Sequence, residues 1–298
     1  MKIILSTGFA ELGNYWGAWP WTKMMGGSER IVVYLAKEFA RMGHETTVRL
    51  PYDHQEQVWE GVRWIGQEAA SQDADLLFCF DDYDRRDRAD KTAAVIVRSD
   101  APRHADFSAL IFLSQTHADF CGYPGQAAVG GGVNLADYAT PLPRLPRRVI
   151  CTSSPDRCPR AAVIGRSFDF RHAYKPVRGF DTTEYDRPDL IALQLSAQVM
   201  AYPLEPRRPS DFFSMAVLEA MAAGTPVVVS DADSMRELWN DAAVVLPNPL
   251  RLSAWHEAIS DLLRDRNRWQ HYSDAGRKLA ETYTWDRQAA RYLAVLGV

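Results

Sequence analysis

Residues 211–231 read DFFSMAVLEAMAAGTPVVVSD, and this stretch decides the fold that the sequence predicts. Its first half is apolar and ends at Gly224, a residue type that commonly terminates helices in a left-handed conformation. Its second half, residues 225–230, is a short apolar run of the kind that forms a strand buried on both faces. A helix followed directly by such a strand is typical of α/β folds with a parallel sheet.

Two carboxylates mark the same stretch. Asp211 and Glu219 have seven residues between them, so one acid lies at the mouth of the predicted helix and the other about two turns inside it. The free N–H groups at a helix N-terminus favour a phosphate. Hydroxyl acceptors at two depths, with phosphate-binding N–H groups between them, suit a nucleotide sugar.

Short apolar runs alternate with helical patterns on both sides of this stretch. From Ser28, a plausible N-cap, apolar residues recur every three or four positions up to Gly43, which predicts a helix. Further helices are predicted at residues 190–198, 253–263, 266–283 and 285–296. Besides residues 225–230, strands are predicted at residues 2–6, 46–50, 74–80, 93–97, 109–113, 149–153, 161–164, 199–202 and 243–246.

A proline-rich segment separates the two halves of the chain. Residues 140–148, TPLPRLPRR, contain three prolines and three arginines, which favours an extended linker over a helix or an inner strand. We therefore predict an N-terminal domain over residues 1–145 and a C-terminal domain over residues 146–284. A chain of 298 residues is long enough for two domains with separate cores.

The start of the C-terminal domain fits this prediction poorly. Residues 155–160, PDRCPR, leave no room for a crossover helix between the predicted strands at 149–153 and 161–164, yet parallel strands need a connection of about a dozen residues. Residues 168–188 show no periodicity. Either a helix is missing from this domain or the predicted strand pairing is wrong.

The composition excludes several classes of protein. A net charge of −4 disfavours a nucleic-acid binder, and no G-x-G-x-x-G follows the first predicted strand, which disfavours a dinucleotide-dependent oxidoreductase. No metal site is expected, because the four cysteines form no C-x-x-C pair and the histidines show no ligand spacing. Reduced thiols and the lack of a signal peptide or a spanning segment predict a cytoplasmic protein.

Five segments, in order along the chain, resemble a known family. They are residues 25–48 with a glycine pair before a helix, 111–138 with a GGVN turn, 151–160 with CTSSPDRCPR, 201–238 around the two acids, and 283–293 with YTWDRQAARYL. The ordered set resembles the retaining glycosyltransferases of GT-B architecture, the glycogen synthase-like "glycosyl transferases group 1". The resemblance implies two Rossmann-like domains that face each other across a cleft. It also implies that residues 285–298 form a last helix that packs back on the N-terminal domain.

The resemblance assigns candidate roles residue by residue. Catalysis is assigned to Asp100, with His104 as its nearest alternative, and to Asp211, which stands where the family has a longer glutamate near the donor sugar. Donor binding is assigned to Gly26, Gly27, Arg157, Phe212, Phe213, Ser214 and Glu219, the last as the acceptor for ribose hydroxyls. From their aromatic character alone, Trp16 and Trp19 are candidates for stacking on a sugar acceptor.

Plainer interpretations of these residues stay open at this point. Asp211 could be the N-cap of the helix, Glu219 could pair with an arginine, and Arg157 could belong to a solvated basic turn. Asp100 could be a loop residue without a role, and the tryptophans could fill a loop core.

The implied function is transfer of a sugar from a UDP- or GDP-linked donor to a glycan, lipid or small-molecule acceptor. Retention of configuration, no metal and no separate cofactor are expected, as is a possible peripheral contact with a membrane; no nucleic-acid partner is expected. Because the C-terminal domain is shorter than the family pattern, a non-catalytic protein that binds a nucleotide or glycan is the alternative.

Overall fold

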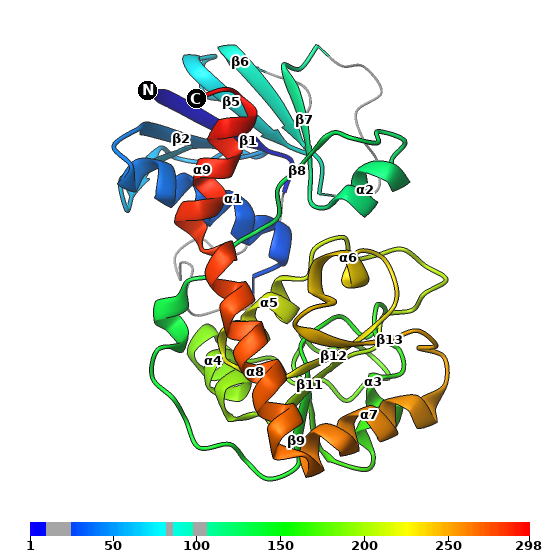
Figure 1. The fold of residues 1–298 in the computed structure, drawn as a ribbon. Coiled ribbons are helices and arrows are strands. Elements are labelled where there is room, and N and C mark those ends of the chain that lie inside the picture. The colour runs from blue at the N-terminus through cyan, green and yellow to red at the C-terminus, as the bar shows by residue number, and fades with distance from the viewer. Residues whose placement is uncertain (10–24, 82–85, 98–105) are drawn as a thin grey trace. The chain divides into compact units, whose positions relative to one another are not determined.

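The computed structural model describes residues 1–9, 25–81, 86–97 and 106–298, which form two compact units. Among these residues, unit 1 contains 1–9, 25–131 and 285–298, and unit 2 contains 132–284. Each unit has its own sheet with helices packed on it (Figure 1). The predicted α/β fold with two parallel-sheet domains is confirmed.

The sheet of unit 1 has the strand order β3-β4-β2-β1-β5-β6-β7-β8. Every neighbouring pair is parallel except β3 and β4, which are antiparallel. The strands are β1 (Lys2–Thr7), β2 (Glu45–Arg49), β3 (Gln57–Trp59), β4 (Val62–Ile65), β5 (Asp73–Phe80), β6 (Arg88–Val95), β7 (Ala109–Phe112) and β8 (Ala127–Ala128). The sequence missed β3 and β4, since they are short and mix polar with apolar residues, and it missed β8, since two alanines give no strand pattern.

Helix α1 (Gly27–Arg41) covers this sheet together with α2 (Gln115–Phe120). Its N-cap is Gly26, not Ser28 as predicted from the sequence. The predicted serine cap is wrong because Ser28 already lies inside the first turn. The helix ends as predicted, since Gly43 has a left-handed φ of 87°.

Helix α9 (Trp285–Val295) belongs to unit 1, although it is the last element of the chain (Figure 1). The ring of Trp285 stacks on Tyr34 of α1 at 5.0 Å between centroids. The fully buried ring of Tyr292 contacts Phe78 of β5, and its hydroxyl donates a hydrogen bond to the carbonyl of Val129 at 3.1 Å. These contacts fill the core of unit 1.

The sheet of unit 2 has five parallel strands in the order β10-β9-β11-β12-β13. They are β9 (Arg148–Cys151), β10 (Asp169–His172), β11 (Val199–Tyr202), β12 (Val227–Ser230) and β13 (Ala243–Leu246). The predicted strand at residues 161–164 is wrong. These residues form helix α3 (Ala161–Gly165), which is the crossover helix between β9 and β10. The unit therefore keeps this strand–helix–strand step, and four apolar residues alone did not distinguish a short helix from a strand.

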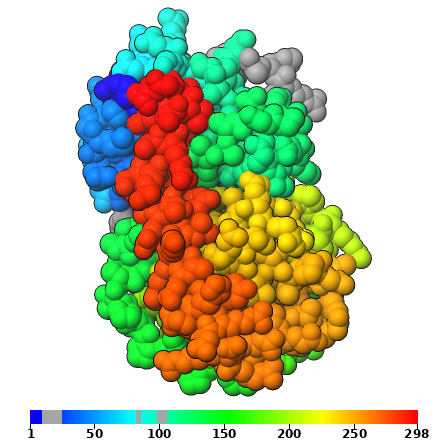
Figure 2. Space-filling view, in the orientation of Figure 1, coloured from blue at the N-terminus to red at the C-terminus, as the bar shows by residue number. Residues whose placement is uncertain are grey.

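The other helices of unit 2 are α4 (Arg187–Ser196), α5 (Met215–Ala222), α6 (Met235–Trp239), α7 (Leu252–Arg264) and α8 (Arg266–Ala280), with the 3₁₀ turns η2 (Leu135–Tyr138) and η3 (Glu281–Tyr283). Trp255, Ile259 and Leu262 of α7 pack on the sheet in one apolar cluster. Helices α7 and α8 form much of the visible surface of this unit (Figure 2).

The predicted linker is extended but forms an integral part of unit 2. The guanidinium of Arg144 donates to the carbonyls of Ala223 and Gly224, just after α5, and to those of Gln194 and Ala197 at the end of α4. It also lies over the ring of Trp269. These carbonyls are the orphan acceptors that helix ends leave without an intrahelical partner, so Arg144 locks the segment onto the unit.

Candidate functional site

The loops that follow β9, β11 and β12 begin at the carboxyl ends of these strands. They carry polar residues of the candidate site. In the sheet of unit 2 the chain moves from β9 to β10 on one side and resumes at β11 on the other. The gap between β9 and β11 is therefore the topological switch point, where open α/β sheets bind their ligands outside the carboxyl ends of the strands. Arg157 follows β9 and Asp211 follows β11, so the fold brings both predicted residues to this point.

Asp211 is buried, and one of its two carboxylate oxygens is engaged. The hydroxyl of Tyr202, the last residue of β11, donates a hydrogen bond to Oδ2 of Asp211. Nη1 of Arg157 lies 3.9 Å from the same oxygen. The N-cap of α5 is Ser214, which accepts the N–H of Val217 at 3.3 Å. The plain interpretation of Asp211 as a helix N-cap is therefore wrong.

A second aspartate supports the backbone of Asp211. Oδ2 of Asp233 accepts the N–H groups of Ser210 and Asp211 at 3.0 and 2.9 Å. Asp233 has a left-handed φ of 49°, a conformation that aspartate tolerates better than most residues. Burial raises the pKa of Asp233, and the two N–H donors lower it by less. The loop after β12 thus fixes the loop that follows β11.

Arg157 is a half-exposed cation beside this carboxylate, with 49% of its side chain accessible. Burial alone would lower the pKa of Arg157, but the negative charge of Asp211 opposes this effect. The pKa of Arg157 therefore lies above its usual value, and the guanidinium stays charged. Arg160, the other cation of this turn, is paired with Glu205 at 2.8 Å. Of these two arginines, Arg157 is the one placed beside Asp211.

Glu219 lies inside a buried polar network. Its Oε1 accepts Nη1 of Arg187 at 2.6 Å, and its Oε2 accepts the amide of Gln194 at 3.4 Å. Arg187 also pairs with Asp137 at 3.1 Å. A buried carboxylate needs such partners because its desolvation is costly. The pairing with an arginine, left open by the sequence, is what the structure shows; the ribose role of Glu219 stays a prediction.

The residues before α5 present little but backbone to a ligand. Phe212, Phe213 and Ser214 are all buried. The ring of Phe213 packs against Trp239 and Tyr283, each at 5.5 Å or slightly more between centroids. A phosphate at this helix N-terminus would therefore meet N–H groups rather than these side chains.

The remaining predicted residues are not part of this group. Gly26 and Gly27 belong to unit 1 and open α1. The carboxylate of Glu29, in the first turn, lies so close to Gly26 that a Cβ there would meet its Oε2 at 2.1 Å. An anion of the protein thus already lies at that helix N-terminus. Trp16, Trp19 and Asp100 lie outside the described residues.

Sequence reasoning missed Tyr202, Asp233 and Arg187. Tyr202 ends an apolar run and was assigned only to the strand, Asp233 falls in an ordinary turn, and Arg187 lies in the segment without periodicity. A signal existed for one of them, because a tyrosine at the carboxyl end of a central parallel strand projects its hydroxyl where ligands bind.

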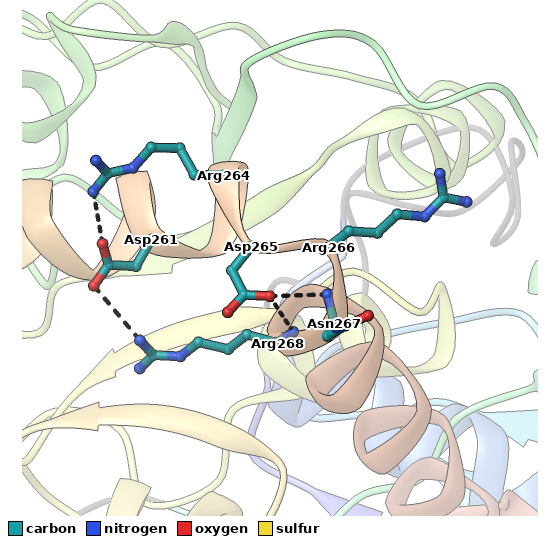
Figure 3. A pocket seen from close by; sticks show the side chains of 6 residues that line it. All are labelled: Asp261, Arg264, Asp265, Arg266, Asn267 and Arg268. Atoms are coloured by element: carbon teal, nitrogen blue, oxygen red, sulfur yellow. Dashed lines mark hydrogen bonds and ion pairs between the residues drawn. The ribbon is translucent and has the colours of Figure 1, made fainter.

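The surface also has a basic hollow elsewhere in unit 2. It measures about 640 Å³ and lies where α7 ends and α8 begins (Figure 3). Asp261 accepts Arg264 at 2.7 Å and pairs with Arg268 at 3.5 Å, while Asp265 caps α8. Because α7 follows β13 and runs back along the sheet, its end lies at the amino edge of the strands, opposite the switch point. This hollow is therefore separate from the candidate site.

The described ranges hold neither a membrane-spanning helix nor a metal site. No helix there is long and apolar enough to cross a membrane. No three His, Cys, Asp or Glu side chains of those residues are grouped so that they could hold a metal ion.

Residues 181–279, which include Arg187, Asp211 and Glu219, match the family model of "Glycosyl transferases group 1". This part of the chain thus resembles the group 1 glycosyltransferases. The recognition made from the sequence is thus confirmed.

Curated relatives match part of the length of this chain. A GDP-mannose-dependent alpha-(1-6)-phosphatidylinositol dimannoside mannosyltransferase of Mycobacterium tuberculosis is 34% identical over 113 residues, which are 38% of this chain and 28% of the relative. A D-inositol 3-phosphate glycosyltransferase of Paenarthrobacter aurescens is 28% identical over 131 residues, which are 42% of this chain and 31% of the relative. The chain thus matches about a third or less of these relatives' length.

Solved structures share the fold over nearly the whole chain. Sucrose-phosphate synthase from Thermosynechococcus elongatus superposes with a TM-score of 0.74 at 13% identity, covering 99% of this chain and 98% of that one. An Anabaena protein solved in complex with UDP and glucose superposes with a TM-score of 0.66 at 13% identity, covering 99% of both chains. The protein therefore has the GT-B fold.

Proposed function

We propose that this protein transfers a sugar from a nucleoside diphosphate sugar to an acceptor. The proposal rests on one observation: Arg157 and Asp211 lie side by side at the switch point of unit 2. In the family that this part of the chain resembles, the corresponding domain binds the donor. A cation and a hydroxyl acceptor side by side suit a diphosphate joined to a sugar.

Each residue has a physical task in this proposal. Arg157 and the N–H groups at the start of α5 bind the diphosphate and stabilise the charge that grows as the glycosidic bond breaks. Asp211 accepts a hydroxyl of the sugar. Glu219, held by Arg187, accepts the ribose hydroxyls.

The names of the relatives support a narrower proposal for the substrates. One relative uses GDP-mannose, and both named relatives act on acceptors that contain inositol. We infer a GDP- or UDP-linked hexose as the donor and an inositol-containing glycolipid or its headgroup as the acceptor. Retention of configuration and independence of metal ions belong to the same proposal, as does the catalytic role of Asp100.

Binding measurements test the donor half directly. We expect GDP with GDP-mannose, or UDP with UDP-glucose, to raise the unfolding temperature, because a ligand that binds only the folded state stabilises it, by about 2.7 kcal/mol at a hundredfold excess over Kd. Calorimetric titration would then give Kd. If none of the four compounds binds, the proposal is wrong.

One matched pair of variants tests the site. Arg157→Gln removes a charge from the diphosphate and should weaken binding of the nucleoside diphosphate about tenfold or more. Arg171→Gln removes an exposed arginine that pairs with Asp169 on β10 and should leave binding within about threefold. Equal effects of the two substitutions would contradict the assigned site. Binding without transfer to any inositol-containing acceptor would favour the non-catalytic alternative.

A further inference from the structure

We propose that Tyr202 is the positioning residue of the site: it holds one oxygen of the Asp211 carboxylate so that the other oxygen faces the sugar of the donor. This inference rests on the proposed function and deepens it, because it assigns sugar recognition to a pair of residues rather than to Asp211 alone.

The two oxygens of Asp211 have different surroundings. Oδ2 accepts the hydroxyl of Tyr202 and lies near Arg157. Oδ1 receives no hydrogen bond from any residue that the structure describes. It is also not among the described side-chain atoms that are shielded from solvent and lack a hydrogen-bond partner. One oxygen is therefore tied to the protein, and the other keeps its contact with solvent and its lone pairs.

Tyr202 is itself held in place. Its ring is 2% exposed at the end of a central strand, and its hydroxyl accepts a hydrogen bond from Oγ of Ser153 at 3.2 Å. Burial and the nearby Asp211 charge raise the pKa of Tyr202 well above its usual value. The hydroxyl therefore keeps its proton and always acts as the donor toward Asp211.

The backbone of Asp211 is held from the opposite side by Asp233. With the main chain held by Asp233 and Oδ2 by Tyr202, the carboxylate keeps little rotational freedom. A group fixed in this way recognises a hydroxyl with less loss of conformational entropy than a free one. An aspartate suits this arrangement, because its short side chain reaches Tyr202 with fewer rotatable bonds than a glutamate would have.

The test compares each nucleoside diphosphate with its sugar derivative. Kd is measured calorimetrically for GDP and GDP-mannose, and in parallel for UDP and UDP-glucose, in wild type, Tyr202→Phe, Asp211→Ala and the double variant. We expect Tyr202→Phe to bind the diphosphate within about threefold of wild type but to lose about tenfold of the extra affinity given by the sugar. Because Tyr202 acts through Asp211, the double variant should be no weaker than Asp211→Ala alone.

The test includes one control variant and one replacement variant. Tyr292→Phe removes another buried hydroxyl, in unit 1, and should leave both constants unchanged. If Tyr202→Phe does not fold, as judged by circular dichroism, Asp211→Asn replaces it. That change places an amide at the carboxylate, and it should abolish the preference for the sugar form while the diphosphate still binds.

Several outcomes overturn the inference. They are additive losses in the double variant, equal losses for the diphosphate and its sugar form, or no change in Tyr202→Phe. In those cases wild type still binds a nucleotide sugar, and the proposed function survives. If wild type binds none of the four compounds, the proposed function and the inference both fail.

Discussion

Asp233 combines three demands at one position: a left-handed backbone, partial burial and two backbone donors. Aspartate and asparagine are the non-glycine residues that meet the first demand at low cost. Only an oxygen at the end of a short side chain meets the third. The residue therefore matters to the loop of Asp211 through its oxygen rather than through its charge.

A pair of substitutions at Asp233 separates the oxygen from the charge. Asp233→Asn keeps an oxygen acceptor and should leave the unfolding free energy at pH 7 equal to that of wild type or higher. Asp233→Ala loses both hydrogen bonds and strains the backbone, and should lower it by about 1–3 kcal/mol. Urea denaturation measures both. A destabilised asparagine variant would show that the charge itself stabilises the loop.

The pH dependence at Asp233 follows from the raised pKa. The folded protein holds the proton of this carboxyl more tightly than the unfolded chain does. Stability from this group is therefore gained as pH falls through the raised pKa toward the ordinary value of 3.8, and lost as pH rises. Relative to Asp233→Asn, wild type should gain stability in a denaturation series from pH 7 to pH 4. A gap that stays constant would contradict the prediction.

At the scale of elements, Arg144 ties an extended segment to the ends of two helices. Burial, with Arg277 nearby, lowers the pKa of Arg144 to about 10, so the guanidinium stays charged at neutral pH. Its donors reach the carbonyl of Ala223, and they share the carbonyls of Ala197 and Gly224 with the hydroxyls of Thr225 and Ser273. A buried carbonyl without a partner costs free energy.

Arg144→Met should therefore destabilise unit 2 by on the order of 3 kcal/mol, because methionine fills the space but donates no hydrogen bond. Urea denaturation followed by tryptophan fluorescence measures the loss. The matched control is Arg251→Met, which removes an exposed arginine with one weak pair to Glu257 and should change stability by about 0.5 kcal/mol or less. A loss below about 1 kcal/mol at Arg144 would show that water satisfies the carbonyls.

Most elements of the fold follow from local patterns, and the exceptions have physical reasons. The C-terminal end of helix α5 was predictable because a glycine commonly ends a helix in a left-handed conformation. Gly224 has a φ of 66°, and a side chain at this position would also clash with Arg277. Helix α3 was mistaken for a strand because its identity is set by the crossover it must make, not by its own four residues. Strand β10 was missed since its polar and charged residues, DFRH, carry no apolar alternation.

The candidate site was predictable where one residue acts alone and unpredictable where partners matter. Asp211 was found because its place at the mouth of the predicted helix is local information, and Arg157 because the short segment around it resembles a family motif. The contacts of Asp211 with Tyr202 and of Glu219 with Arg187 join residues 9 and 32 positions apart. Such pairs depend on how strands and helices pack, which no single segment of sequence encodes.

At the scale of the whole molecule, the two units have separate cores, and α9 completes the core of unit 1. Tyr292→Ala should leave a cavity beside Phe78 and Phe80 and cost about 3–5 kcal/mol. Hydrogen exchange followed by mass spectrometry should then show lower protection in β1 and β5 and unchanged protection in β11 and β12. Tyr292→Phe is the control. Equal loss of protection in both units would mean that they unfold as one cooperative structure.

The return of α9 to unit 1 also sets the order of events during synthesis. Domains commonly fold as they leave the ribosome, the N-terminal one first. Here unit 1 lacks the ring of Tyr292 until α9 has been translated, whereas residues 132–284 of unit 2 are translated before α9. The part of the chain that is made first is thus finished last, and its uncovered aromatic face must stay soluble throughout elongation.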